Sequence, residues 1–107
     1  YANFILDTDS EIELIGVRDL DIFKKYPNAS KVSLDLDSGI ELEAGSLPKS
    51  IIELDLGDSY VGQLGGILHE GLEVLHVGKN YPYTISLSDI PKSVEKIVCG
   101  SSTRYLR

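Results

Sequence analysis

Short segments in which apolar and polar residues alternate recur along the chain. In Leu54-Asp55-Leu56 the alternation has a period of two, which places the two leucines on one side of a short strand and the aspartate on the other. Similar strands are predicted at 12–14 and 96–99 and within the repeat copies at 30–36 and 71–78. The apolar anchors of these strands, which follow one another at about 20 to 22 residues, are Leu14, Leu34, Leu54, Leu75 and Ile97.

A strand of this length cannot bury its apolar side alone, but equivalent strands from successive repeats can stack and share a core. The sequence therefore predicts an α/β solenoid with a short parallel sheet on its concave side, one early helix at 19–26, and mostly extended or irregular segments on the convex side. We expect residues 1–107 to form a single domain of about four to five repeats, the last of them incomplete.

The segment before each strand also repeats. Leu47-Pro48-Lys49-Ser50 returns as Ile90-Pro91-Lys92-Ser93, where proline blocks helix formation and we expect the serine to hydrogen-bond the local backbone. The glycines that follow the strands tolerate positive φ and permit a sharp turn; they are Gly57, Gly78 and Gly100.

These segments resemble a known family. Leu-Pro-x-Ser-apolar-x-x-Leu-x-Leu-Gly is similar to the FNIP repeat, a short variant of the leucine-rich repeat. The aromatic and final aliphatic residues of the family's Phe-Asn-x-Pro-Ile segment are matched in Tyr60–Leu64 and Tyr81–Ile85, although its Asn and Pro are not. Before residue 30 the turn at 23–28 resembles that of an ordinary leucine-rich repeat. The resemblance implies a recognition array without catalytic residues, and we expect no cofactor and no metal.

The two ends of the chain are predicted from shorter patterns. Phe4-Ile5-Leu6 is expected to form an edge strand, followed by a turn at 7–10. Only residues 101–107 follow the last predicted strand, so that strand should leave an open sheet edge. Three coverings are open for this edge: the tail with Arg104 and Arg107, a continuation of the chain, or another copy.

Composition narrows the classes of partner. The net charge of −7 disfavours nucleic acid and anionic membrane surfaces and favours a protein partner with a basic surface. The lone Cys99 excludes an internal disulfide framework and favours a reducing compartment, which predicts a cytoplasmic location. No signal peptide is recognisable, and no stretch approaches the roughly 18 apolar residues of a membrane span.

Candidate chemistry is sparse. Asp-x-Asp follows an apolar run at Asp7-Thr8-Asp9 and at Asp35-Leu36-Asp37, but a phosphatase built on this motif needs a larger doubly wound sheet, so we interpret these residues as turn carboxylates. His69 and His76 have no ligand partner three or four residues away, which predicts no zinc site. Cys99 falls at an inward strand position and is expected to be a buried thiol.

The outward positions of the strands are the remaining candidate site. We predict that partner binding occurs on this concave surface, and that replacing Asp55 by alanine alters binding while changing stability by less than about 0.5 kcal/mol. The rivals are a scaffold element that self-associates through its open C-terminal end, an enzyme, an extracellular adhesin, and a merely solvated face. The predicted binding residues are Glu13, Ser33, Asp35, Glu53, Asp55, Val74, His76, Lys96 and Val98.

Overall fold

Seven strands form one sheet in the computed structural model of the chain, which describes residues 4–7, 12–36, 42–43, 45–60, 62, 64–79, 81, 85, 87–100 and 102–105. One short α-helix and one 3-10 helix accompany the strands in this part of the chain. In chain order the elements are β1 (Phe4–Asp7), β2 (Ile12–Val17), α1 (Ile22–Lys25), β3 (Lys31–Leu34), β4 (Glu53–Asp55), β5 (Val74–Val77), η1 (Leu87–Asp89), β6 (Lys96–Cys99) and β7 (Ser102–Tyr105).

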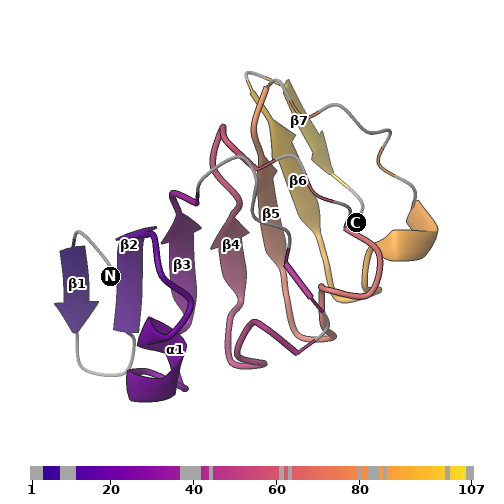
Figure 1. The fold of residues 1–107 in the computed structure, drawn as a ribbon. Coiled ribbons are helices and arrows are strands. Elements are labelled where there is room, and N and C mark those ends of the chain that lie inside the picture. The colour runs from indigo at the N-terminus through magenta and orange to yellow at the C-terminus, as the bar shows by residue number, and fades with distance from the viewer. Residues whose placement is uncertain are drawn as a thin grey trace.

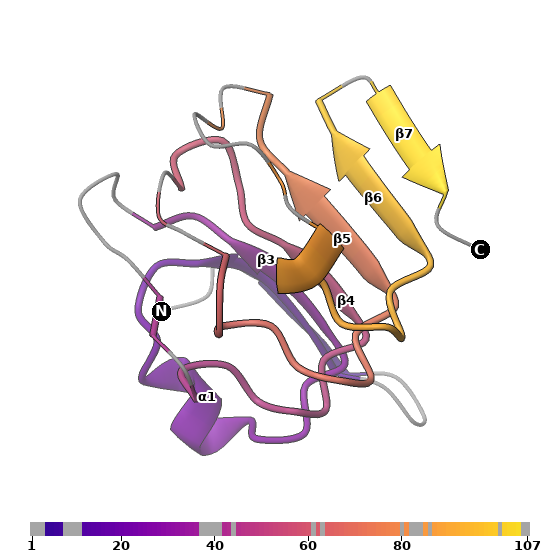
Figure 2. The same ribbon diagram turned by 90° about the vertical axis from the view of Figure 1, so that its right-hand side faces the viewer.

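The strands lie in the sheet in the order in which they occur in the chain (Figure 1). The five strands from β2 to β6 are parallel, whereas β1 and β7 pair antiparallel with their neighbours at the two ends. Parallel neighbours require a crossover. Here each crossover and the strand that follows it make one turn of the solenoid, which we call a coil. Figure 2 shows the sheet on one side of these coils, with α1, η1 and the connecting segments on the other. The chain is therefore solenoid-like, as the repeat predicted.

One ladder of aliphatic residues runs through the middle of the parallel strands. It contains Leu14, Val32, Leu54, Leu75 and Ile97, which are register partners from β2 to β6. All five are 5% exposed or less, and Leu54 and Leu75 are fully buried. Because each strand lends one side chain to this ladder, no coil has a complete core of its own.

The register corrects one predicted anchor. Leu34 does not pair with Leu54; Val32 does, and Leu34 is instead opposite Val17. The first interval of the ladder, from Leu14 to Val32, is shorter than the others, so the even spacing from Leu14 to Leu34 was misleading. A shift between Leu14 and Val17, with Gly16 at φ 73°, marks the irregularity in β2. The anchor itself moves by two residues, from Leu34 to Val32, so the inward and outward sides of β3 are unchanged.

In three successive coils, one side chain of the coil hydrogen-bonds a backbone carbonyl group of the preceding coil. Ser50 Oγ lies 2.6 Å from Ala29 O, and Ser93 Oγ donates to Leu72 O at 2.7 Å. The coil between them lacks the Pro-x-Ser sequence, and there His69 Nε2 lies 2.9 Å from the equivalent carbonyl of Ile51. Since a carbonyl oxygen only accepts, this nitrogen carries the proton. The serines were predicted to bond the local backbone; they join successive coils instead.

The residues that match the family's aromatic position also join successive coils. Tyr60 is 1% exposed, and its ring stacks on that of Tyr81 with 6.4 Å between centroids and 9° between planes. Tyr81 donates its hydroxyl proton to Gly62 O at 2.7 Å. Leu64 is buried and Ile85 packs against the core, as expected for the aliphatic position. The aromatic pair therefore joins two successive coils by ring stacking and by a hydrogen bond.

Close backbone approach explains the glycine after β5. Gly57 and Gly100 have the expected positive φ, but Gly78 does not. A Cβ atom on Gly78 would lie 2.7 Å from Asp58 Cα and 2.8 Å from Gly57 O, so a side chain cannot fit between these coils.

The predicted ends and helices need three corrections. The helix expected at 19–26 is reduced to the four residues of α1, and the convex side, expected to be mostly extended or irregular after that helix, also contains η1. At the C-terminal end, β7 pairs with all four residues of β6, so the expected open edge at β6 is covered by the tail. Arg104 is opposite Ile97 in this pairing, while Arg107 lies outside the described residues.

Candidate binding surface

The side of the sheet that faces away from the coils presents two rows of side chains, here called the strand face. Each residue on it is half-buried, whereas the alternate residues of β3, β4 and β5 are buried. By register, the first row contains Glu13, Lys31, Glu53, Val74 and Lys96, and the second contains Ser33, Asp55, His76 and Val98.

Eight of the nine predicted binding residues therefore lie together. The exception is Asp35, which follows β3, is exposed, and forms an ion pair with Arg18 at 3.3 Å. Lys31 was missed, although the 22-residue step back from Glu53 leads to it. The cause is the misplaced anchor in β3: with Leu34 opposite Leu54, the residues opposite Glu53 and Asp55 become Ser33 and Asp35.

Inclusion of Lys31 changes the charge of the strand face. Lys31 is the register partner of both Glu13 and Glu53, so a cation separates the two carboxylates of the first row. Together with Asp55 and Lys96, the face carries three carboxylates and two ammonium groups. Three acids and two bases leave this face with a net charge of only −1, so the net charge of −7 does not arise mainly on this surface.

Contacts between β4 and β5 hold the centre of the strand face. His76 Nε2 lies 3.3 Å from Glu53 Oε2, with side chains 31% and 42% exposed. On the same strand as Glu53, Asp55 accepts a hydrogen bond through Oδ1 from Gly57 N–H at 2.9 Å. Asp55 thus helps to form the turn after β4 as well as the surface. His76 and Asp55 are direct register partners, which places all three polar groups in one cluster.

Asp55→Ala is therefore expected to lower the free energy of unfolding by about 1 kcal/mol, because the Gly57 N–H loses its charged acceptor. This value replaces the smaller effect expected from the sequence. Urea denaturation followed by circular dichroism gives the change, and Asp55→Asn, which keeps an oxygen acceptor, is the matched control. Equal stabilities for wild type and Asp55→Ala would show that the turn does not depend on this carboxylate.

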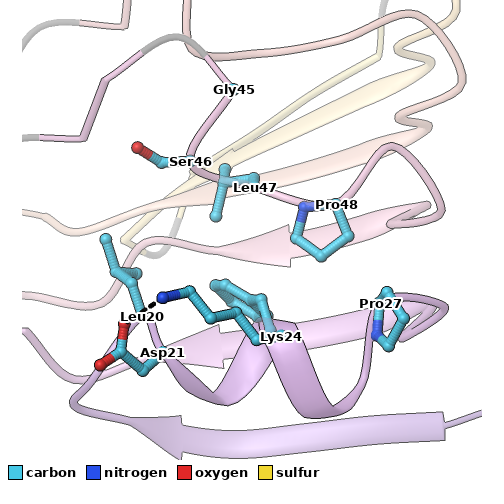
Figure 3. Close-up of a pocket in the computed structure, with 9 residues that line it drawn as sticks. Leu20, Asp21, Lys24, Pro27, Gly45, Ser46, Leu47 and Pro48 are labelled. Carbon is cyan, nitrogen blue, oxygen red and sulfur yellow. Dashed lines mark ion pairs between the residues drawn. The ribbon is translucent and has the colours of Figure 1, made fainter.

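A groove of about 420 Å³ lies on the other side of the molecule, between α1 and the segment 45–48 of the next coil (Figure 3). Its walls include Leu20, Phe23 and Leu47, of which the last two belong to the buried core. Asp21 precedes α1, and its Oδ1 lies 3.6 Å from Lys24 Nζ on the helix, so the two form an exposed ion pair on the rim. The groove therefore offers an apolar floor beside a balanced pair of charges.

A second groove of about 380 Å³ occurs two coils later at equivalent repeat positions. Ile90 and Pro91 occupy places like those of Leu47 and Pro48 in the first groove, and Leu68 adds another apolar side chain. Glu70, Asp89 and Lys92 make this lining more polar. Both recesses arise where one coil fails to cover the next. Because their linings differ, the pair does not form one repeated binding surface.

The other groups considered as candidate chemistry are the carboxylates, Cys99 and His69. No cluster of three or more metal-ligating side chains occurs among the described residues, and Asp9 and Asp37 lie outside them. Cys99 is opposite Val77 as expected, yet it is half-buried rather than buried, and its Sγ lies 3.9 Å from Gly78 O. His69 serves the contact between coils described above. No helix in the described part of the chain is long and apolar enough to cross a membrane.

Comparison of the chain with protein-family models, with curated proteins and with solved structures found no match. The fold therefore defines only a broad class: in its described part, the chain is a solenoid-like stack of coils with five parallel strands and few helices.

Proposed function

We propose that this protein is a leucine-rich-repeat solenoid of the FNIP type that binds another protein on its strand face and has no catalytic activity. The observation that carries the proposal is the row of half-buried charged and aliphatic side chains displayed by five parallel strands at fixed spacing. A parallel sheet is normally covered on both faces, but no described element covers this one. An unoccupied, chemically mixed sheet face suits recognition of a partner.

The repeat assignment is supported by the positions that the structure makes equivalent. Tyr60 and Tyr81 stack on each other, and Ser50 and Ser93 make the same contact with the preceding coil. These residues belong to the motif on which the family resemblance rests.

The lone half-buried Cys99 fits a reducing compartment, so we place the protein in the cytoplasm as part of this proposal.

Partner capture tests the binding function. Immobilised protein is incubated with lysate of the source cells, and retained proteins are quantified by mass spectrometry. The face variant carries Glu13→Ala, Glu53→Ala and Lys96→Ala; the control variant carries Glu43→Ala, Asp58→Ala and Lys92→Ala, which are exposed residues of the connecting segments. Both remove two acids and one base.

We expect the face variant to recover its specific partner about tenfold less than wild type, because several polar contacts are lost together, while the control variant recovers it fully. Circular dichroism checks that both variants are folded. Equal recovery by all three proteins would contradict binding on the strand face.

A further inference from the structure

The part of the strand face on β4, β5 and β6 forms a block of six side chains with a fixed arrangement of charge. Negative groups lie on β4 and a positive group lies on β6, two strands away. The two valines occupy a diagonal across β5 and β6, next to the imidazole of His76. In register order, the first row of this block is Glu53, Val74 and Lys96, and the second is Asp55, His76 and Val98.

The carboxylates of the block retain capacity to bind a cation. Glu53 contacts His76 through Oε2 and Asp55 accepts from Gly57 through Oδ1. A carboxylate has about four lone-pair positions, so each group keeps acceptor sites beyond its internal contact. The Glu53 side chain is 42% exposed. A partner cation placed above β4 would therefore meet two carboxylates from one side.

The spacing of the block limits the shape of the partner. Neighbouring strands are about 4.8 Å apart, so the line from β4 to β6 spans about 10 Å. Seven residues of an α-helix rise about 10.5 Å, and residues three or four positions along lie on the same face between the two ends. A helix whose axis crosses the strands thus presents three consecutive contacts at the distances that this block offers.

We propose that the β4–β6 block binds a helix of a protein partner with Lys or Arg at position i, Leu or Ile at i+3 or i+4, and Asp or Glu at i+7. The basic residue binds Glu53 and Asp55, the aliphatic side chain covers Val74 and Val98, and the acidic residue binds Lys96. This inference rests on the proposed binding function and specifies the partner's chemistry.

Charge complementarity favours this partner over a uniformly basic one. A basic residue above β6 would meet the ammonium group of Lys96, and one above β3 would meet Lys31. Like charges brought together at an interface suppress binding of the wrong partner. Phosphate groups of a nucleic acid would instead meet Glu53 and Asp55, which repel them.

Three synthetic peptides test the arrangement directly. Each is an alanine-based helix with leucine at i+3. Its length of about 18 residues is slightly above the length below which isolated helices are only marginally stable in water. They differ at positions i and i+7, which carry Lys and Glu, Lys and Lys, or Glu and Glu. Compensating residues on the opposite helix face give all three the same net charge, so that long-range attraction to an acidic protein does not decide the order. Fluorescence anisotropy at low salt measures Kd for wild type, Lys96→Glu and the control Lys92→Glu.

Wild type should bind the Lys/Glu peptide about fivefold more tightly than either of the others, a ratio in the range of exposed ion pairs. Lys96→Glu should prefer the Lys/Lys peptide, because the charge above β6 is reversed, and Lys92→Glu should keep the wild-type order. Should Lys96→Glu fail to fold by circular dichroism, Lys96→Gln replaces it and should abolish the preference between the Lys/Glu and Lys/Lys peptides.

Two results overturn the inference: no binding of any peptide at about 1 mM, or an order of affinities that Lys96→Glu leaves unchanged. The lysate experiment separates this failure from failure of the proposed function. If capture still depends on the strand face, the protein binds a partner there that does not follow the helical pattern. If capture does not depend on that face, the binding proposal itself fails.

Discussion

Leu54→Ala is expected to lower the free energy of unfolding by about 2–5 kcal/mol, because it opens a cavity in the middle of the aliphatic ladder. Leu54 is fully buried and has Val32 on one side and Leu75 on the other. Collapse into the cavity is hindered because both neighbours belong to coils held by their own backbone pairing. The truncation therefore weakens contacts in three coils at once.

Urea denaturation monitored by circular dichroism measures this loss, and Val98→Ala is the matched control. Val98 lies on the strand face and is half-buried, so its truncation should cost about 1 kcal/mol or less. A small and equal effect of both substitutions would mean that Leu54 does not lie in a shared core layer. A change in the denaturant slope would show that the coils no longer unfold together.

The alternation of apolar and polar residues predicted most of the sheet because its physical cause is local. In Leu54-Asp55-Leu56 a period of two fixes which side chains are buried wherever the strand is placed. Burial of Leu54 and Leu56 at 1% exposure or less, with Asp55 half-exposed, confirms this prediction. The stacking of coils followed because the same pattern returns at nearly constant intervals.

Register was less predictable, since it depends on the length of a connection. Val32 and Leu34 both have the right parity, and either could have been the anchor of β3. In the structure, the bulge in β2 and the short first coil place Val32 in the ladder beside Leu54. The same two-residue ambiguity removed Lys31 from the predicted binding surface and added Asp35. The sequence thus predicted the side of the sheet that faces away from the coils, but not the full pattern of charge on it.

Contacts between coils were the other feature that local reasoning could not supply. A serine after Pro-Lys has several backbone partners within reach in sequence, but Ser50 and Ser93 bond carbonyl groups 21 residues earlier. The substitution of His69 for this serine in the middle coil has no sequence signal, because its side chain comes from another repeat position. The antiparallel covering by β7 likewise required the sheet itself, since a strand of four residues has little sequence pattern.

Gly57→Ala is expected to lower the free energy of unfolding by roughly 2–4 kcal/mol, from two separate causes. Gly57 has φ 79°, and the left-handed region costs a residue with a side chain about 1–2 kcal/mol. In addition, a Cβ atom at this position would lie 2.5 Å from Leu34 O, a backbone atom of the preceding coil that cannot rotate away. Relief of that contact requires β4 and β3 to separate at their carboxyl ends, which adds strain of the order of 1–2 kcal/mol.

Gly66→Ala separates the two causes. Gly66 has nearly the same backbone angle, φ 80°, but a Cβ atom there meets nothing within 4 Å. Its replacement should cost only the conformational part, about 1–2 kcal/mol, so the difference between the two variants measures how closely the coils approach. Thermal and urea denaturation of both variants give this difference. Equal losses would mean that the coils are free to separate at Gly57, and that the tight stacking after β4 contributes little to the stability of the solenoid.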